Sequence, residues 1–194
     1  MLDQIQRSLS QIINLDLSEF DFFATLLRRK TLKKRELLLR SGEDCRDIYF
    51  INRGCLRYFY LVNGEEKTAQ FFFEDSWYTD YESFLSGDPS TNFVDAIEDT
   101  ELLCLDRESL QKLYVQNPKF ERFGRIAAEN AYLGIKYRTK KLTILTAEER
   151  YLELIRERPT IFTRVPQYYI ASYLNIQPES LSRIRRKLAT RKKD

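Results

Sequence analysis

The spacing of apolar side chains predicts a helical beginning to this chain. Residues 2 to about 29 are predicted to be helical, with one face made of Leu2, Ile5, Leu9, Ile12 and Ile13. Within this stretch Ser18 and Asp21 resemble a capping box, which indicates a second helical start. The cationic segment 28–35 is interpreted as a solvated connection, because exposed Lys and Arg side chains need no partner in water.

The apolar pattern becomes β-like between Leu37 and Leu105. Short runs rich in β-branched and aromatic residues alternate there with turn residues, which is typical of strands. Asn63-Gly64 is the strongest hairpin signal, because both residues tolerate the left-handed backbone of a tight turn. Many short strands at regular spacing predict a barrel or a jelly roll, with most of the aromatic residues in its core.

Helical spacing returns after this region. A short helix is expected over residues 107 to about 116, broken at Asn117-Pro118, and a long one from Lys119 to about Thr143. The long helix carries a seam with steps of three and four, made of Phe123, Ile126, Asn130, Leu133 and Tyr137. A stripe of small residues lies beside it, made of Ala127, Ala131 and Gly134. The pattern fits a two-stranded interface or a helix buried against its own β region.

The last part of the chain has two short amphipathic segments joined by a break. Thr146 and Glu149 form a capping-box pattern that starts a helix through about Glu157. Apolar faces then recur around Ile170 and around Leu181, with Asn175 at the break and Pro178 at the next first turn. The polar side chains that face outward from the second segment are Gln177, Glu179, Ser180, Ser182, Arg183, Arg186 and Lys187.

Such a helix–turn–helix with a cationic second helix suits the major groove of DNA, whose width admits one helix. An ordinary helical hairpin with a solvated basic tail fits the same spacing. The charge distribution adds to the first interpretation: the chain from Gln177 onward has seven Lys or Arg and two acids, whereas the rest has 25 and 27. A polyanionic partner is therefore expected at the C-terminal end.

Residue content excludes several classes of site. The chain has no His, which removes His-based catalytic triads, His-ligated metals and His-ligated haem. Its three cysteines are isolated, which argues against a disulfide scaffold or a zinc or iron–sulfur site and fits a reducing cytoplasm. No apolar run approaches the length of a membrane span, and the first residues lack a signal-peptide pattern. No catalytic and no metal-ligating residues are expected.

The segment Y-Y-I-A-S-Y-L-N-I-Q-P-E-S-L-S-R-I-R-R-K-L closely resembles the helix-turn-helix of Crp/Fnr-type bacterial transcription regulators. The resemblance implies that Glu179 and Arg183 contact bases, and Pro178 stands where the family often has Arg, so the base preference should differ. It also implies a parallel homodimer through the long helix, with Asn130 fixing the register, and admits RNA polymerase as a further partner.

The β region resembles the cyclic-nucleotide-binding β-roll of the same family, through Gly42-Glu43, I-Y-F-I-N-R-G at 48–54 and the N-G-E-E hairpin. The family's two ligand-binding pairs align with Thr79-Asp80 and Ser90-Thr91, the expected effector pocket. No cation replaces the family's phosphate-binding Arg, and Asp88 and Asp95 lie nearby. Since a buried phosphate without a cationic partner is costly, an unidentified effector, or none, is expected instead of cyclic AMP.

The expected fold is α+β: a β-roll or jelly roll with flanking helices over residues 1–117, a dimerisation helix over 118–145, and a small helix-turn-helix domain without a full wing over 146–194. The expected function is sequence-specific DNA binding by a homodimer, with half-sites about 34 Å apart. The predicted DNA-binding residues are Gln177, Glu179, Ser180, Ser182, Arg183, Arg186, Lys187, Arg191 and Lys192. The predicted dimer interface is Phe123, Ile126, Ala127, Asn130, Leu133, Gly134 and Tyr137.

Two other functions remain open at this level. One is a ligand-sensing β-roll whose basic helical tail binds a protein, and the cation excess argues against it. An enzyme on a cupin-like β-roll is the other, but that chemistry needs clustered His and Glu metal ligands.

Overall fold

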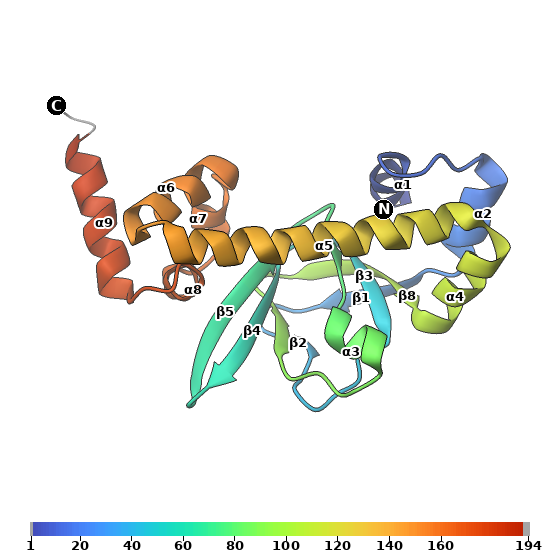
Figure 1. Ribbon diagram of the computed structural model, residues 1–194, viewed down its shortest axis with the longest axis horizontal. Coiled ribbons are helices and arrows are strands. Elements are labelled where there is room, and N and C mark those ends of the chain that lie inside the picture. The colour runs from blue at the N-terminus through green and yellow to red at the C-terminus, as the bar shows by residue number, and fades with distance from the viewer. Residues whose placement is uncertain (1, 192–194) are drawn as a thin grey trace. The chain divides into compact units, whose positions relative to one another are not determined.

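The computed structural model describes residues 2–191 and has the predicted α+β architecture (Figure 1). The chain forms two compact units. One contains the chain up to Tyr58 together with Phe71–Tyr132, and the other contains Phe59–Gln70 together with the chain from Leu133 onward. Each unit is described separately below.

Two helices open the first unit, α1 (Leu2–Ser10) and α2 (Leu17–Thr25). The capping box lies two residues earlier than predicted. Asp16, rather than Ser18, is the N-cap of α2: its carboxylate accepts from the Glu19 N–H at 2.9 Å, and the Glu19 carboxylate accepts from the Asp16 N–H at 2.8 Å. Ser18 instead donates its hydroxyl to the Asp16 carboxylate at 2.7 Å, so the Ser18–Asp21 prediction was wrong.

The β-roll consists of two four-stranded sheets, in the orders β1-β8-β3-β6 and β2-β7-β4-β5. The pairs β1–β8, β3–β8, β3–β6 and β2–β7 are antiparallel. The strands are β1 (Arg28–Leu32), β2 (Leu37–Leu39), β3 (Asp47–Arg53), β4 (Leu56–Val62), β5 (Glu65–Phe72), β6 (Trp77–Tyr78), β7 (Phe93–Ala96) and β8 (Thr100–Asp106). A short helix, α3 (Tyr81–Ser86), separates β6 from β7.

The cationic segment that was interpreted as a connection is largely a strand. Arg28–Leu32 pairs with β8 in register from Arg28↔Cys104 to Leu32↔Thr100. β1 is an edge strand, and its first four side chains are exposed. Charged side chains on an edge strand oppose pairing with another chain, which explains the polar sequence of β1.

The β4–β5 hairpin turns at the predicted dipeptide. Asn63 has φ 52° and Gly64 has φ 80°. Two successive residues with positive φ define the type I′ turn, whose twist matches that of the flanking strands.

Two hydrophobic clusters hold the first unit together, and the strands alternate between them. Phe50 of β3 packs with the helices, whereas its neighbour Ile51 packs between the two sheets. Leu103 and Leu102 of β8 divide in the same way. This alternation follows from the two-residue period of a strand, which sends successive side chains to opposite faces.

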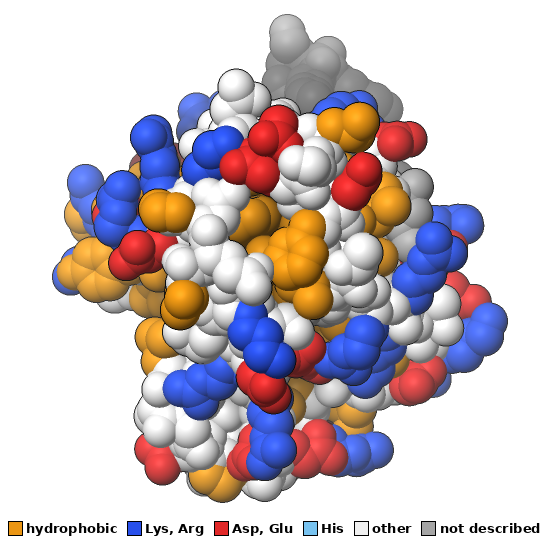
Figure 2. Space-filling model, turned by 90° about the vertical axis from the view of Figure 1, so that its right-hand side faces the viewer, with side chains coloured by type: hydrophobic (Ala, Val, Ile, Leu, Met, Phe, Trp, Pro, Cys, Tyr) orange, Lys and Arg blue, Asp and Glu red, His pale blue; other side chains and the backbone are white. Residues whose placement is uncertain are grey.

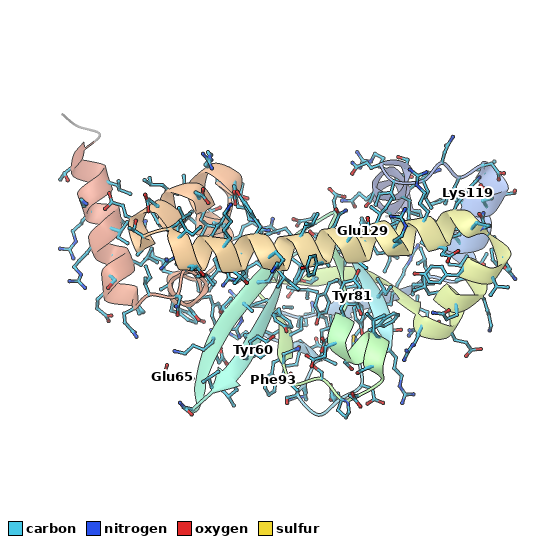
Figure 3. All side chains as sticks on the ribbon, viewed as in Figure 1. Tyr60, Glu65, Tyr81, Phe93, Lys119 and Glu129 are labelled. Atoms are coloured by element: carbon cyan, nitrogen blue, oxygen red, sulfur yellow. The ribbon has the colours of Figure 1, made fainter. Side chains whose placement is uncertain are left out.

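Two more helices follow the β-roll: α4 (Arg107–Gln116) and α5 (Pro118–Ile144), both within a residue of the predicted bounds. Lys119 begins α5 beside α2, where its amine pairs with Glu19 at 2.6 Å (Figure 3). Phe123 is buried and packs edge-on against Trp77, with the ring centroids 4.9 Å apart. Phe123 therefore belongs to the core of its own chain.

The second unit contains the end of α5 and the helices α6 (Ala147–Glu157), α7 (Ile161–Arg164), α8 (Gln167–Tyr173) and α9 (Pro178–Arg191). Thr146 and Glu149 form the predicted capping box of α6, whereas α7 was not predicted. The buried apolar side chains of this unit are Phe59, Tyr151, Leu154, Ile161, Val165, Ile170, Ala171, Leu174 and Leu181. Within residues 2–191 no strand follows β8, and none of the helices is long and apolar enough to cross a membrane.

Candidate functional site

α8 and α9 are joined by a tight left-handed turn at Asn175. Asn175 has φ 55°, its N–H donates to the Ser172 carbonyl at 3.0 Å, and the Ile176 N–H donates to the Ala171 carbonyl at 3.0 Å. These two bonds define a Schellman ending of α8, which satisfies carbonyls that the helix leaves unpaired. The turn fixes the direction in which α9 leaves α8.

α9 buries one side and exposes the other. Leu181 is buried, Ile184 and Leu188 are half-buried, and all three lie on one face of the helix. The opposite face carries Glu179, Arg183, Arg186 and Thr190, spaced by four, three and four residues and all exposed. The predicted reading face therefore points to solvent.

Several polar side chains of α9 are already engaged. Arg183 donates to the Ser180 hydroxyl at 3.1 Å, and Ser182 donates to the Pro178 carbonyl at 3.1 Å. Lys187 pairs with Glu148 of α6 at 2.5 Å, so a phosphate would compete with a carboxylate for this amine. The side chain of Arg191 and all of Lys192 lie outside the described part of the structure.

The β4–β5 hairpin is bonded to α8, a contact that the sequence did not reveal. The Ser172 hydroxyl accepts from the Thr68 N–H at 2.9 Å and donates to the Glu66 carbonyl at 3.2 Å. Glu65 lies towards the tip of the same hairpin (Figure 3). The β4–β5 hairpin is thus in direct contact with α8.

Charges on the N-terminal unit are mixed. On the face of the molecule in Figure 2, cationic and anionic side chains are interspersed around a group of apolar ones. This face offers a polyanion no continuous cationic surface, in contrast to the exposed arginines of α9.

Three of the four predicted effector-pocket residues are buried together with Asn92. The Asp80 carboxylate accepts from the Asn92 side-chain amide at 3.1 Å, and the Ser90 hydroxyl bonds to the Asn92 backbone. The Thr79 hydroxyl donates to the Asp47 carbonyl at 3.0 Å. Thr91 is exposed, whereas the next residue, Asn92, is buried.

The two acids that were expected near the pocket lie in different surroundings from each other. Asp88 is exposed. Asp95 is buried and pairs with Arg57 of β4, from Nε to Oδ1 at 2.9 Å and from Nη2 to Oδ2 at 2.8 Å. The β-roll therefore does contain a buried cation, but Asp95 already neutralises it.

The same region holds buried polar atoms without a hydrogen-bond partner among the described residues, namely Tyr78 OH and Asn92 Oδ1. Burial raises the pKa of Tyr78 well above its usual value, so this phenol remains protonated. Within residues 2–191 no group of three or more acidic or Cys side chains is placed to hold a metal ion.

The C-terminal half of α5 carries exposed apolar side chains. Leu133, Tyr137 and Ile144 lie on one face and are exposed, as are Asn130 and Gly134 of the predicted interface, whereas Ile126 and Ala127 are half-buried. Within the second unit, Arg138 points from a different side of the helix and donates to the carbonyls of Thr68 and Tyr173, at 3.4 Å and 2.9 Å.

Comparison with known proteins supports the same architecture. Residues 29–117 match the family described as Cyclic nucleotide-binding domain. No curated protein matches the chain. FixK2 from Bradyrhizobium japonicum has 21% sequence identity and a TM-score of 0.72, over 85% of each chain.

Two further solved structures are similar over most of their length. A transcriptional regulator of the crp/fnr family from Eubacterium rectale has 16% identity and a TM-score of 0.70, over 91% of this chain and 85% of that one. The c-di-GMP responsive global regulator CLP from Xanthomonas campestris has 17% identity and a TM-score of 0.67, over 90% and 92%. The chain thus matches the cyclic nucleotide-binding family over residues 29–117, and its fold is similar to those of FixK2 and of a crp/fnr-family regulator.

Proposed function

We propose that this protein is a homodimeric, sequence-specific DNA-binding transcription regulator of Crp/Fnr type that acts in the cytoplasm without cyclic AMP. The exposed face of α9 carries the proposal. Glu179, Arg183 and Arg186 share that face, while Leu181 anchors the other side in the core. A helix held in this way is able to enter the major groove with its polar side leading.

Base contacts and phosphate contacts divide along α9. Glu179 and Arg183 lie in the first half of the helix, which in helix-turn-helix proteins faces base edges. Glu179 is suited to accept from the amino group of cytosine, and Arg183 to donate two hydrogen bonds to guanine. Arg186, Lys187, Arg191 and Lys192 follow towards the C-terminal end and would supply affinity for phosphates.

A homodimer through α5 would present two such helices. The exposed face of Leu133, Tyr137 and Ile144 extends over three turns, which suits pairing with the same helix of a second copy. Two-fold symmetry would then require a near-palindromic DNA site with half-sites about 34 Å apart.

The β-roll would not recognise cyclic AMP, because its buried cation is occupied. A cyclic phosphate would have to displace Asp95 from Arg57, and the separated carboxylate would remain buried without its partner. The buried acid Asp80 is a second obstacle to an anion, since it lies among the residues that align with the family's ligand-binding pairs.

The salt dependence of DNA binding by the full chain tests the proposal. The affinity for a mixed-sequence duplex should fall steeply as salt rises, because each neutralised phosphate releases counterions. Binding to DNA that is absent or insensitive to salt would contradict the proposal and favour the alternative in which the basic helices bind a protein.

A further inference from the structure

A cavity of about 160 Å³ lies entirely within the second unit. Its walls come from the end of α5, from α6, from the end of α8 and from Gln70 of β5. The charged side chains in the walls are Arg138, Lys141, Arg150, Glu153, Glu157 and Arg158. Cations therefore outnumber acids around this space.

The two acids are held by Lys141. Its amine pairs with Glu153 at 2.9 Å and with Glu157 at 2.7 Å, and little of this amine is exposed. The acids and Lys141 thus form their own network along one wall, and the remaining cations of the cavity are its arginines.

Arg138 and Arg150 bond to carbonyl oxygens and, among residues 2–191, to no carboxylate. Arg138 donates from Nη2 to the carbonyls of Thr68 and Tyr173. Its guanidinium carbon lies 3.9 Å from the centroid of the Tyr173 ring. Arg150 donates from Nε to Leu174 at 3.1 Å and from Nη1 to Leu145 at 2.6 Å. Among residues 2–191, Arg138 Nη1 and Nε and Arg150 Nη2 have no hydrogen-bond acceptor, so they are able to donate to a ligand.

The arginines also repel one another. Burial lowers the pKa of Arg138, and the charges of Arg158 and Arg150 lower it further. Neighbouring guanidinium groups in a partly closed space are stabilised when an anion lies between them, because each retains its charge at neutral pH.

From this geometry we infer that the cavity is a binding site for a small oxyanion, a phosphate or carboxylate group, coordinated by Arg138 and Arg150 with Arg158 beside them. The inference does not depend on DNA binding. The space is far larger than one water requires but smaller than the 300–1,000 Å³ of pockets for drug-sized ligands. It therefore suits a phosphate or a short dicarboxylate.

The position of the cavity connects it with the reading helices. Arg138 and Arg150 hold the carbonyls of Tyr173 and Leu174, which are the last residues of α8 before the turn. An anion bound to the same guanidinium groups would either reinforce or weaken these bonds, and so change how firmly α8 is held against α5 and β5.

Calorimetric titration of the full chain with inorganic phosphate, at constant ionic strength, tests the site. Wild-type protein should bind phosphate saturably. Arg138→Gln and Arg150→Gln should each weaken binding about tenfold or more, because a charge-assisted donor is lost. Arg125→Gln is the matched control: Arg125 is on α5 but exposed and pairs with Glu129, outside the cavity, so its loss should leave the affinity within about twofold.

A second control separates this site from the cations of α9. Arg183→Ala with Arg186→Ala should leave phosphate binding unchanged. The inference is overturned if these changes abolish binding while Arg138→Gln does not, or if wild-type protein shows only a non-saturable response. A parallel titration with malonate distinguishes the ligand classes: whichever anion binds more tightly through Arg138 and Arg150 identifies the group that the site accepts.

Chemical modification keeps the inference testable if the variants fail to fold. Phenylglyoxal labelling of wild-type protein, mapped by mass spectrometry, should slow at Arg150 and Arg158 when phosphate is present and stay unchanged at Arg125. Equal rates at all three arginines with and without phosphate would refute the site.

Discussion

Arg57 and Asp95 form a bidentate ion pair inside the β-roll, with 1% and 9% of their side chains exposed. The residues lie on β4 and β7, which are neighbours in one sheet. Asp95 therefore supplies from within the chain the negative charge that the buried guanidinium requires.

Removing one member of this pair should be more costly than removing both. Asp95→Ala leaves the Arg57 guanidinium buried without this carboxylate and should lower the free energy of unfolding by about 3–5 kcal/mol. Arg57→Met combined with Asp95→Leu should cost less than Asp95→Ala. Urea denaturation measures both. Arg28→Gln, which breaks the exposed pair with Asp47, is the control and should cost less than about 1 kcal/mol. Additive losses in the double variant would show that the pair is not coupled.

Cyclic AMP should not stabilise the protein. A ligand at a concentration 100 times its Kd stabilises the native state by about 2.7 kcal/mol, which is several degrees in Tm. The nucleotide is added at about 1 mM, which is about 100 times a Kd of about 10 μM. Thermal denaturation should then give the same Tm as for the protein alone. A saturable rise in Tm with cyclic AMP would contradict the claim that the Arg57–Asp95 pair prevents the β-roll from binding this nucleotide.

The proposed dimer makes a face-specific prediction for α5. Leu133 and Ile135 are almost equally exposed, 61% and 65%, but they point to opposite sides of the helix. Leu133→Asp should convert the dimer to a monomer, because a charge is then buried at the seam, whereas Ile135→Asp should leave it a dimer. Sedimentation equilibrium reports the mass. A wild-type monomer, or equal effects of both changes, would remove α5 as the interface.

Stability should decline at alkaline pH through the buried thiol of Cys104. Burial raises the pKa of Cys104 from 9.0 to about 11. A raised folded-state pKa means that the thiolate forms more readily in the unfolded chain. The contribution of the Cys104 thiol to the free energy of unfolding is therefore complete below about pH 9 and is lost as pH rises to 11. At about 1.4 kcal/mol per pKa unit, the loss amounts to at most about 3 kcal/mol. Denaturation of wild-type protein and Cys104→Ala between pH 8 and 11 should show the steeper decline in wild type. Parallel pH profiles would contradict this.

Local patterns predicted those parts of the fold that depend on neighbours in sequence. The Asn63-Gly64 turn, the Thr146–Glu149 capping box and the bounds of α5 follow from local backbone chemistry, and the structure confirms them. Strand β1 was missed because four of its five side chains are exposed, so it lacks the apolar run that identifies a strand.

The features missed at the candidate sites are contacts between distant segments. Asp95 was recognised as an acid near the effector region, but its partner Arg57 is 38 residues earlier. The contact of Ser172 with β5 spans more than 100 residues. Phe123 fits the α5 seam by spacing alone, and only the position of Trp77 assigns it to the core. Periodicity specifies which face a residue occupies but not what covers that face.

Selection of bound duplexes from a random DNA pool tests the central claim most directly. Wild-type protein without added ligand should enrich a near-palindrome whose half-sites are about 10 base pairs apart. Arg183→Ala should lose discrimination at one position of each half-site, by about 1–3 kcal/mol, whereas Arg186→Ala should weaken all sequences alike and flatten the salt dependence. Failure of the wild-type protein to enrich any sequence, or equal effects of both substitutions on every sequence, would contradict sequence-specific reading by α9.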